Sequence, residues 1–191
     1  MEQHMTDDEQ YVADSIDKWI RAGFYAQDDI ERMVDDIIEE DADAGELKSL
    51  IGPKLRAKLR EERAWPAVTD CDRLDQVFYV LHEQGICALA NAGYTMSDGY
   101  SEVAEAVAQA PDGHYHAYCF YHGQDVERAI EGDGVMLAFG DLADHGERSV
   151  AAGQAIAGAL RQAGFLVEWD GSIDTRINLP LFDWKKRAAT A

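Results

Sequence analysis

The 191-residue sequence has few cysteines, few prolines and no long apolar run. The three cysteines, Cys71, Cys87 and Cys119, are odd in number and widely spaced, so we expect buried thiols and neither a disulfide framework nor a zinc site. No segment approaches the roughly 20 apolar residues that a membrane-spanning helix needs. The amino terminus lacks the basic start and apolar core of a secretory signal. We therefore expect a cytoplasmic protein that does not associate with a membrane.

Basic residues are also scarce, since 17 Lys and Arg stand against 37 Asp and Glu, a formal net charge of −20. Such a charge repels phosphate groups, which argues against binding to nucleic acid. The acidity has two interpretations: general solubility, or a face that docks on a basic protein partner. No feature of the sequence indicates an oligomeric state.

The acidity is uneven along the chain. Residues 1–50 hold most of the excess, with acidic runs at 28–29, 35–36 and 39–41, whereas residues 54–63 carry five basic side chains. This pattern predicts helices whose opposite charges face one another.

Residues 1–66 have the pattern of an acidic helical subdomain. Apolar residues recur at helical spacing in three stretches, 12–20, 30–38 and 47–59. Gly52 and Pro53 interrupt the third stretch and should break or kink its helix, because proline lacks the amide hydrogen. We place the boundary with the main domain, residues 67–191, directly after this subdomain.

The main domain alternates helical and strand-like segments. Strands are expected at 86–90, 115–121 and 135–139, and a terminal hairpin at 165–169 and 175–179. The first and third strands are apolar on both faces, which is typical of central strands covered on both sides. The fold class is therefore α/β or α+β, with a single mixed sheet of about five strands flanked by helices.

Three of these strands end in short polar loops that contain glycine, at 91–99, 122–125 and 170–174. Because rigid scaffolds display functional groups on loops at strand ends, we expect a binding groove there. Its candidate residues are Asn91, Tyr94, Ser97, Asp98, His122, Gln124, Asp125, Trp169, Asp170 and Arg176.

Each of these loops also has a purely structural interpretation. Ser97 and Asp98 suit the start of the following helix, and Asp170 suits a turn. Arg176 could pair with Asp174 or with Asp125.

The histidines of the second strand suggest a metal site. In an extended segment His114, His116 and His122 share one face, and Asp125 follows. Imidazole and carboxylate suit zinc, iron or manganese. His114 and His116 form a His-x-His pair, but no further histidine or cysteine stands at a recognisable ligand spacing from this pair, so we expect no metal and no other cofactor. Cys119 lies on the opposite face of the strand from these histidines, which argues against a thiol nucleophile activated by them.

Four short stretches at the same loops carry a resemblance. They are Asn-Ala-Gly-Tyr-Thr-x-Ser-Asp-Gly at 91–99, Tyr-His-x-Gln-Asp at 121–125, Leu-Ala-Phe-Gly at 137–140, and Trp-Asp-Gly-Ser at 169–172 followed by Arg-Ile at 176–177. In this combination the chain resembles a family of uncharacterised bacterial proteins, a domain of unknown function, over about residues 70 to 187. The resemblance implies no activity.

Three functional hypotheses follow. In the first, the protein is a non-catalytic binding protein of the inhibitor or immunity type, whose acidic helices bind a basic protein. In the second, it is a small hydrolase or lyase that uses His122 and Asp125 with Asp98 or Asp170 as a second carboxylate, with or without a divalent metal, which requires these side chains to converge in one pocket. In the third, the loops are purely architectural.

Overall fold

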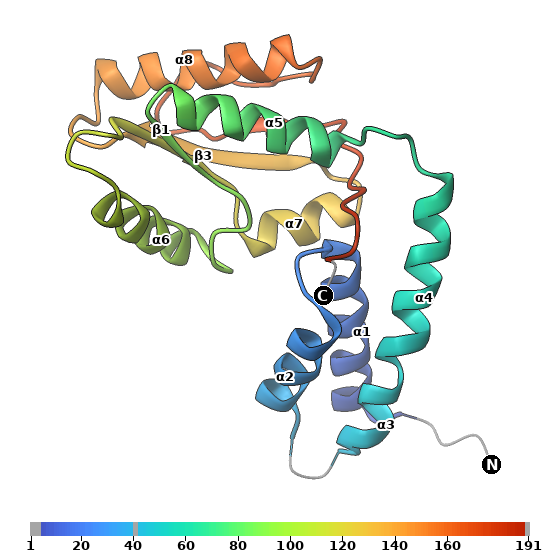
Figure 1. Ribbon diagram of the computed structural model, residues 1–191. Coiled ribbons are helices and arrows are strands. Elements are labelled where there is room, and N and C mark those ends of the chain that lie inside the picture. Colours follow the sequence, from blue (N-terminus) through green and yellow to red (C-terminus); the bar gives the residue numbers. More distant parts are fainter. Residues whose placement is uncertain (1–4, 40–41, 190–191) are drawn as a thin grey trace. The chain divides into compact units, whose positions relative to one another are not determined.

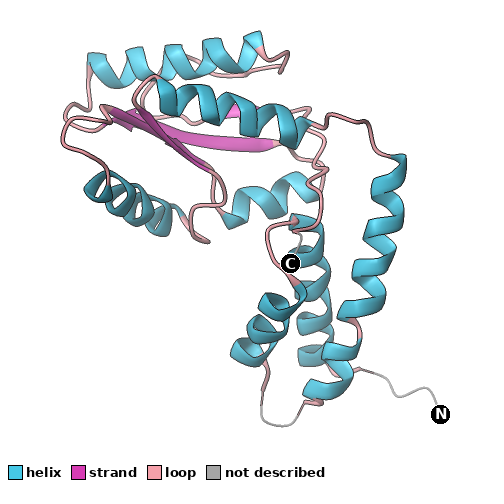
Figure 2. Cartoon of the chain, viewed as in Figure 1, coloured by secondary structure: helices cyan, strands magenta, loops and turns pink. Residues whose placement is uncertain are grey.

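The computed structural model describes residues 5–39 and 42–189, which form helices α1 to α8 and strands β1 to β4 (Figures 1 and 2). The chain divides into two compact units. The first comprises residues 1–67 together with 185–191, and the second comprises residues 68–184. None of the described helices is long and apolar enough to cross a membrane.

The first unit contains α1 (Asp7–Ala22), α2 (Gln27–Ile37), α3 (Ala44–Ser49) and α4 (Ile51–Glu61), followed by a short 3-10 turn at Glu62–Ala64. The predicted break in the third apolar stretch is confirmed and falls at Leu50, between α3 and α4. Pro53 then lies in the first turn of α4, where a missing N–H costs no helical hydrogen bond.

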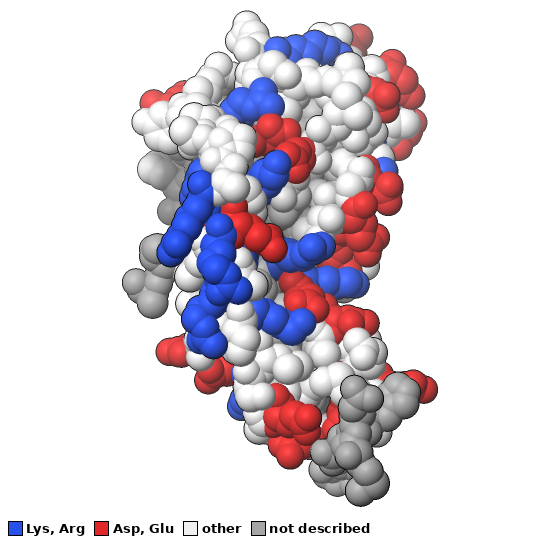
Figure 3. Space-filling model, turned by 90° about the vertical axis from the view of Figure 1, so that its right-hand side faces the viewer, with Lys and Arg blue, Asp and Glu red and all other residues white. Residues whose placement is uncertain are grey.

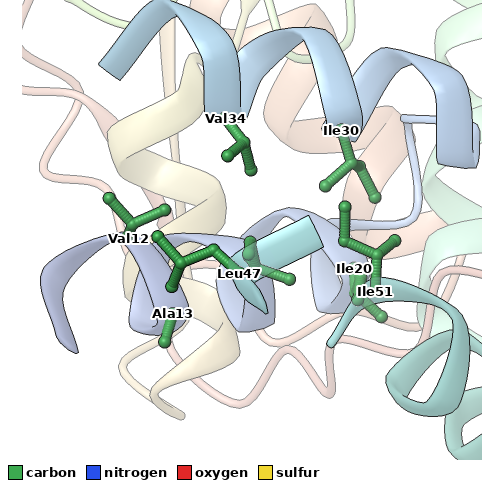
Figure 4. Close-up of a cluster of buried hydrophobic side chains, with 8 residues drawn as sticks. Val12, Ala13, Ile20, Ile30, Val34, Leu47 and Ile51 are labelled. Atoms are coloured by element: carbon green, nitrogen blue, oxygen red, sulfur yellow. The ribbon is translucent and has the colours of Figure 1, made fainter. Parts of the chain in front are cut away.

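The core of the first unit is built from all four helices. Figure 4 shows Ile30 and Val34 pointing from α2 toward side chains of the other helices. The buried residues of this core are Val12, Ala13, Ile16, Ile20, Ile30, Val34, Leu47 and Ile51. Each helix has buried its apolar stripe, as the helical spacing of these residues predicted.

Opposite charges pair between these helices, as expected. Lys54 of α4 lies 2.6 Å from Asp17 of α1, and Lys48 of α3 lies 2.6 Å from Asp35 of α2. In the face shown in Figure 3, basic and acidic side chains lie beside one another. Of the acidic run at 39–41, Glu40 and Asp41 lie outside the described residues.

The basic C-terminal segment packs within the first unit. The Lys186 ammonium lies 4.8 Å from the centre of the Phe24 ring, and Arg187 donates a hydrogen bond to the Pro66 carbonyl at 2.8 Å. The Ala188 amide donates to the Glu62 carboxylate at 2.7 Å. Local composition could not reveal these partners, because they lie more than 100 residues away in the chain.

The second unit is a four-stranded mixed sheet in the order β1-β2-β3-β4, which confirms the predicted fold class. Strand β1 (Ile86–Leu89) pairs in parallel with β2 (Ala117–Phe120), which pairs antiparallel with β3 (Val135–Asp141); β3 pairs antiparallel with β4 (Ile177–Leu179).

Helices cover both faces of this sheet. α5 (Asp70–Glu83) and α8 (Glu147–Gln162) lie on one face, and α6 (Met96–Gln109) and α7 (Gly123–Ile130) on the other (Figure 1). This double cover explains why β1 and residues 135–139 of β3 are continuously apolar. Cys71, Cys87 and Cys119 are buried thiols, as predicted.

The predicted terminal hairpin is present only in part. Residues 165–169 form no strand and are joined to β4 only by the bridge between Glu168 and Asn178. The partner of β4 is β3, with Ile177 opposite Leu137, both fully buried. Phe165 stacks on Phe182 instead, with ring centres 5.6 Å apart. Pairing with β3 buries the apolar residues of β4, which a hairpin with an exposed Leu166 would not do.

Candidate functional site

The first two polar loops lie side by side, because β1 and β2 are parallel and end at the same edge of the sheet. Backbone hydrogen bonds continue their pairing beyond the strands. The Ala92 amide donates to the Tyr121 carbonyl at 2.9 Å, and the Gly123 amide donates to the Gly93 carbonyl at 2.8 Å. The loop at 91–99 and the loop at 122–125 are thereby held against one another.

Asp98 is used as a helix cap. Its Oδ2 accepts hydrogen bonds from the backbone amides of Tyr94 and Thr95 and from the Thr95 hydroxyl, and the Thr95 hydroxyl accepts from the Asp98 amide in return. The bond from the Thr95 amide is the main reason that the pKa of Asp98 is lowered. This reciprocal arrangement is a capping box at the start of α6.

His122, Asp125 and Arg176 form a buried cluster, here called the strand-end cluster. Asp125 is 2% exposed and His122 is 4% exposed. The Nη1 atom of Arg176 donates to both carboxylate oxygens of Asp125, at 2.9 and 3.0 Å. Asp125 Oδ2 also accepts from the His122 amide at 3.1 Å, which caps α7. Of the two partners that the sequence suggested for Arg176, the structure has Asp125.

The His122 ring is held within this cluster. Its Nε2 lies 3.3 Å from Asp125 Oδ2 and 3.4 Å from Arg176 Nη1, while its Nδ1 is buried without a hydrogen-bond partner among the described residues. Burial lowers the pKa of His122, and Arg176 lowers it further; the carboxylates of Asp125 and Asp98 oppose this shift. The neutral imidazole is therefore the favoured form near neutral pH.

The remaining groove candidates divide between two places. Tyr94 lies on the rim of the paired loops and donates a hydrogen bond from its hydroxyl to Glu127 at 3.2 Å. Asn91 is half-buried at the end of β1 and has a positive φ of 52°. Ser97 and Gln124 are exposed in the first turns of α6 and α7.

Trp169 and Asp170 are held in their own turn. The Trp169 ring packs edge-on against Phe139 at 5.2 Å, and its Nε1 donates to the Ser172 carbonyl at 2.9 Å. Asp170 accepts hydrogen bonds from the Ser172 amide and the Thr175 hydroxyl, and the Thr175 bond is the first cause of the lowered pKa of Asp170. The segment at 169–176 contributes Arg176 to the strand-end cluster, while Trp169 and Asp170 stabilise the turn.

His114 and His116 precede β2, whereas His122 follows it, so the strand separates them. The His116 amide donates to the Gly85 carbonyl, and the His116 carbonyl accepts from the Leu142 amide, both at 2.9 Å. Within residues 5–39 and 42–189, no three His, Cys, Asp or Glu side chains are grouped so that they could hold a metal ion. Burial raises the pKa of the Cys87 thiol to about 11 and that of the Cys119 thiol further, so both are poor nucleophiles.

A pocket of about 470 Å³ lies elsewhere in the second unit, and none of the ten groove candidates lines it. It is bounded by α6, β2, the end of β3, the start of α8 and the segment before β4. Its lining residues are Tyr100, Val103, Ala104, Tyr118, Phe139, Gly140, Asp141, Leu142, His145, Ser149, Ile173 and Asp174. We call it the aromatic pocket.

Gly140 makes room for one wall of the aromatic pocket. A Cβ atom at this position would lie 2.6 Å from the Tyr118 hydroxyl oxygen, closer than such atoms can approach. Tyr118 in turn meets Tyr100 edge-on, with ring centres 5.9 Å apart. The signal that could have indicated the pocket is this glycine at the end of an otherwise apolar strand, because a glycine there suggests close approach by another group.

The chain belongs to the family described as Domain of unknown function (DUF6891), whose model matches residues 5–188. The match includes α1 to α4, so it extends further toward the amino terminus than the resemblance over residues 70 to 187 indicated. Neither the curated proteins nor the solved structures contain a match to the chain.

Proposed function

We propose that this protein is a non-catalytic binding protein of the cytoplasm, of the inhibitor or immunity type, and that it docks a basic protein partner on the outer face of α2. The observation that carries this proposal is the arrangement of acidic side chains on that helix. Asp28, Glu31 and Asp35 recur at i, i+3 and i+7, which is one face of a helix, whereas Ile30 and Val34 are buried. We call Asp28, Glu31, Asp35 and Asp36 the acidic α2 face.

The carboxylates of Asp28, Asp35 and Asp36 are available to a partner, whereas Glu31 is half-buried and accepts a hydrogen bond from Gln27 at 2.8 Å. Asp28 and Asp36 are exposed, and neither has an ion-pair partner among the described residues. Asp35 pairs with Lys48 and keeps 55% of its side chain exposed. An exposed cluster of like charges raises the rate of encounter with a basic protein and disfavours acidic ones.

The neighbouring acid Asp29 has a different role. It pairs with Arg32, and it accepts a hydrogen bond from the Ala26 amide at 3.0 Å at the start of α2. Neutralising the whole run at 28–29 would therefore also weaken the helix.

The side chains that a hydrolase or lyase would use already make structural contacts. Asp125 and His122 are buried, and Arg176 occupies both oxygens of the Asp125 carboxylate. Asp98 caps α6. A general acid or base must come within hydrogen-bond reach of a substrate. Because these side chains are buried or already bonded to protein groups, their arrangement favours binding over catalysis as the function.

The test neutralises the acidic α2 face without touching its cap. The triple variant Asp28→Asn, Glu31→Gln, Asp36→Asn removes three charges. Proteins retained from a cell extract by the immobilised wild-type chain are identified by mass spectrometry, and the affinity of each purified candidate is measured by calorimetry at two salt concentrations. We expect a basic protein whose affinity falls about tenfold or more in the variant and falls with added salt.

A matched control separates this face from net charge. Asp112→Asn, Glu131→Gln, Asp133→Asn removes the same three charges from exposed positions of the second unit. The control should bind the partner as the wild type does. Equal loss in both triple variants, or binding that is indifferent to both, would contradict the proposal.

A further inference from the structure

The charges of the residues that line the aromatic pocket suit a bound cation. Its lining includes two carboxylates, Asp141 and Asp174, and contains no Lys or Arg. The unit around it, residues 68–184, carries 19 acidic and five basic side chains. Its volume of about 470 Å³ lies within the range of about 300 to 1,000 Å³ that is typical of small-ligand sites. A positively charged small ligand is attracted to such a pocket, and an anion is repelled.

The surroundings of Asp141 also favour a bound cation. The residue is 5% exposed, and its Oδ1 accepts hydrogen bonds from the backbone amides of Ala143 and Asp144, at 2.8 and 2.9 Å. No described residue donates a hydrogen bond to its other oxygen, Oδ2. Oδ2 is therefore open to a further donor, and a ligand that supplies a donor and a positive charge would form a charge-assisted hydrogen bond here.

Asp174 stands at the exposed edge of the same pocket. The sequence offered Arg176 as its partner, but that guanidinium binds Asp125. The described residues supply Asp174 with no other ion-pair partner. Two carboxylates therefore face one pocket, one at the inner wall and one at the edge, without a protein cation between them.

The aromatic walls favour one class of cation. Tyr100 and Tyr118 meet edge-on in the lining, and Phe139 lies beside them. Aromatic ring faces attract cations within about 6 Å. A guanidinium group is planar, stacks on such rings, is weakly hydrated and matches a carboxylate with two parallel donors, whereas an ammonium group is a compact, strongly hydrated point charge.

We propose that the aromatic pocket binds a guanidinium cation, with Asp141 as the buried carboxylate partner, Asp174 as the outer one, and Tyr100 and Tyr118 as the aromatic wall. The cation is supplied either by a free small molecule or by the arginine side chain of a peptide. This site lies in the second unit and does not depend on the acidic α2 face of the first.

The test is a titration of the full chain, followed by NMR chemical shifts and calorimetry. The probes are N-acetyl-arginine amide and its uncharged isostere N-acetyl-citrulline amide. We expect the arginine probe to bind, with shifts concentrated at Tyr118, Gly140 and Asp141, and the citrulline probe to bind at least about tenfold more weakly, because a charge-assisted hydrogen bond is lost. Equal binding of the two probes, no binding of either, or shifts located elsewhere would overturn the proposal.

Variants test the assigned roles. Asp141→Asn keeps an oxygen for the two backbone amides while removing the charge, and it should weaken arginine binding about tenfold. Tyr100→Leu, at an exposed position, should weaken it by a smaller factor. Asp133→Asn removes one charge outside the pocket and should leave the affinity within about twofold of the wild type. Equal effects of Asp141→Asn and Asp133→Asn would show attraction by net charge alone and would refute the site.

Two further probes identify the source of the cation. Agmatine represents a free small molecule, and acetyl-Gly-Arg-Gly amide represents a peptide side chain. Tighter binding of agmatine assigns the site to a metabolite-like cation, and tighter binding of the peptide assigns it to a protein partner. Failure of both probes would overturn the proposal even if the acidic α2 face binds its partner.

Discussion

Asp125 in the strand-end cluster and Asp141 in the aromatic pocket are both buried carboxylates of the second unit, but their surroundings differ. Asp125 is 2% exposed and has the Arg176 guanidinium on both oxygens. Asp141 is 5% exposed, receives two backbone amides on one oxygen and has no ion-pair partner in the part of the chain that the structure describes. The first is neutralised by the fold, and the second is the carboxylate to which we propose that a cationic ligand binds. Burial alone therefore does not distinguish a structural carboxylate from a binding one; the set of partners does.

The strand-end loops and the aromatic pocket differ in the same way: the carboxylates of the loops have protein partners, and those of the pocket have fewer. The polar residues of the strand-end loops are the functional candidates that the sequence suggests, yet Asp98 and Asp125 cap helices and Asp170 stabilises a turn. The aromatic pocket is built mainly from residues that resemble ordinary core or surface positions. Its aromatic and acidic lining arises because α6, β3 and the segment before β4 lie next to one another in the fold.

The largest expected effect comes from removing the cation of the strand-end cluster. Arg176→Met keeps an apolar stem and leaves the buried Asp125 carboxylate without its partner, so the free energy of unfolding should fall by about 3 kcal/mol or more. Urea denaturation measures this. Arg176→Lys should recover part of the loss, because the charge returns without the planar group.

The matched control for this variant is Arg161→Met at an exposed position of α8. It should change the free energy of unfolding by less than about 0.5 kcal/mol. If the two Arg→Met variants were equally stable, Asp125 would not depend on Arg176, and the contrast with Asp141 would be lost.

A smaller effect is expected at the wall of the aromatic pocket. Gly140→Ala places a methyl group 2.6 Å from the Tyr118 hydroxyl oxygen, which should cost about 1 to 3 kcal/mol of stability and also abolish binding of the arginine probe. Thermal unfolding and calorimetry measure the two quantities. Gly158→Ala in α8 meets no atom within 4 Å, so it should raise stability by about 0.5 to 1 kcal/mol. A harmless Gly140→Ala would mean that Tyr118 does not pack against residue 140.

The smallest expected effect is the pH dependence of the strand-end cluster. The pKa of His122 in the folded chain lies below its ordinary value of 6.5, so the unfolded chain takes up the proton first as the pH falls. The stability that the neutral His122 contributes is fully present above pH 6.5 and is lost as the pH falls below it. Asp125 and Asp98 reduce this loss, and Arg176 increases it.

Thermal unfolding between pH 7.5 and 5.5 tests this prediction. His122→Asn should flatten the decline, because asparagine does not titrate and still suits the first position before α7. His114→Asn, at an exposed position, should leave the decline unchanged. A decline of equal slope in the wild type and in His122→Asn would assign it to other groups.

Much of the fold could be predicted from local patterns. Apolar residues at helical spacing predicted α1 and α2, and continuous apolar runs predicted β1 and β3, because a buried face repeats with the period of its own backbone. The partner of β4 could not be predicted in this way. Leu137 and Ile177, which face one another across β3 and β4, are 40 residues apart in the sequence, and pairing with β3 buries Ile177 and Leu179.

The candidate site divides in the same manner. The sequence predicted a groove at the strand-end loops. The structure places the loops at 91–99 and 122–125 side by side, because β1 and β2 are parallel and end at one edge of the sheet. Within the third loop the sequence alone left Arg176 with two possible partners. The aromatic pocket was missed, because Tyr100, Tyr118, Asp141 and Asp174 are unremarkable in their own segments.

The sequence by itself determined the class of fold, the helical character of the first 66 residues, the buried thiols and the acidity, because each depends on composition or on spacing within one segment. Only the tertiary structure decided which carboxylates are satisfied. Asp125 and Asp141 both follow or end buried strands, and neither segment encodes the cation that one has and the other lacks. That difference depends on where Arg176 lies, 51 positions after Asp125 in the chain, and long-range packing alone sets it.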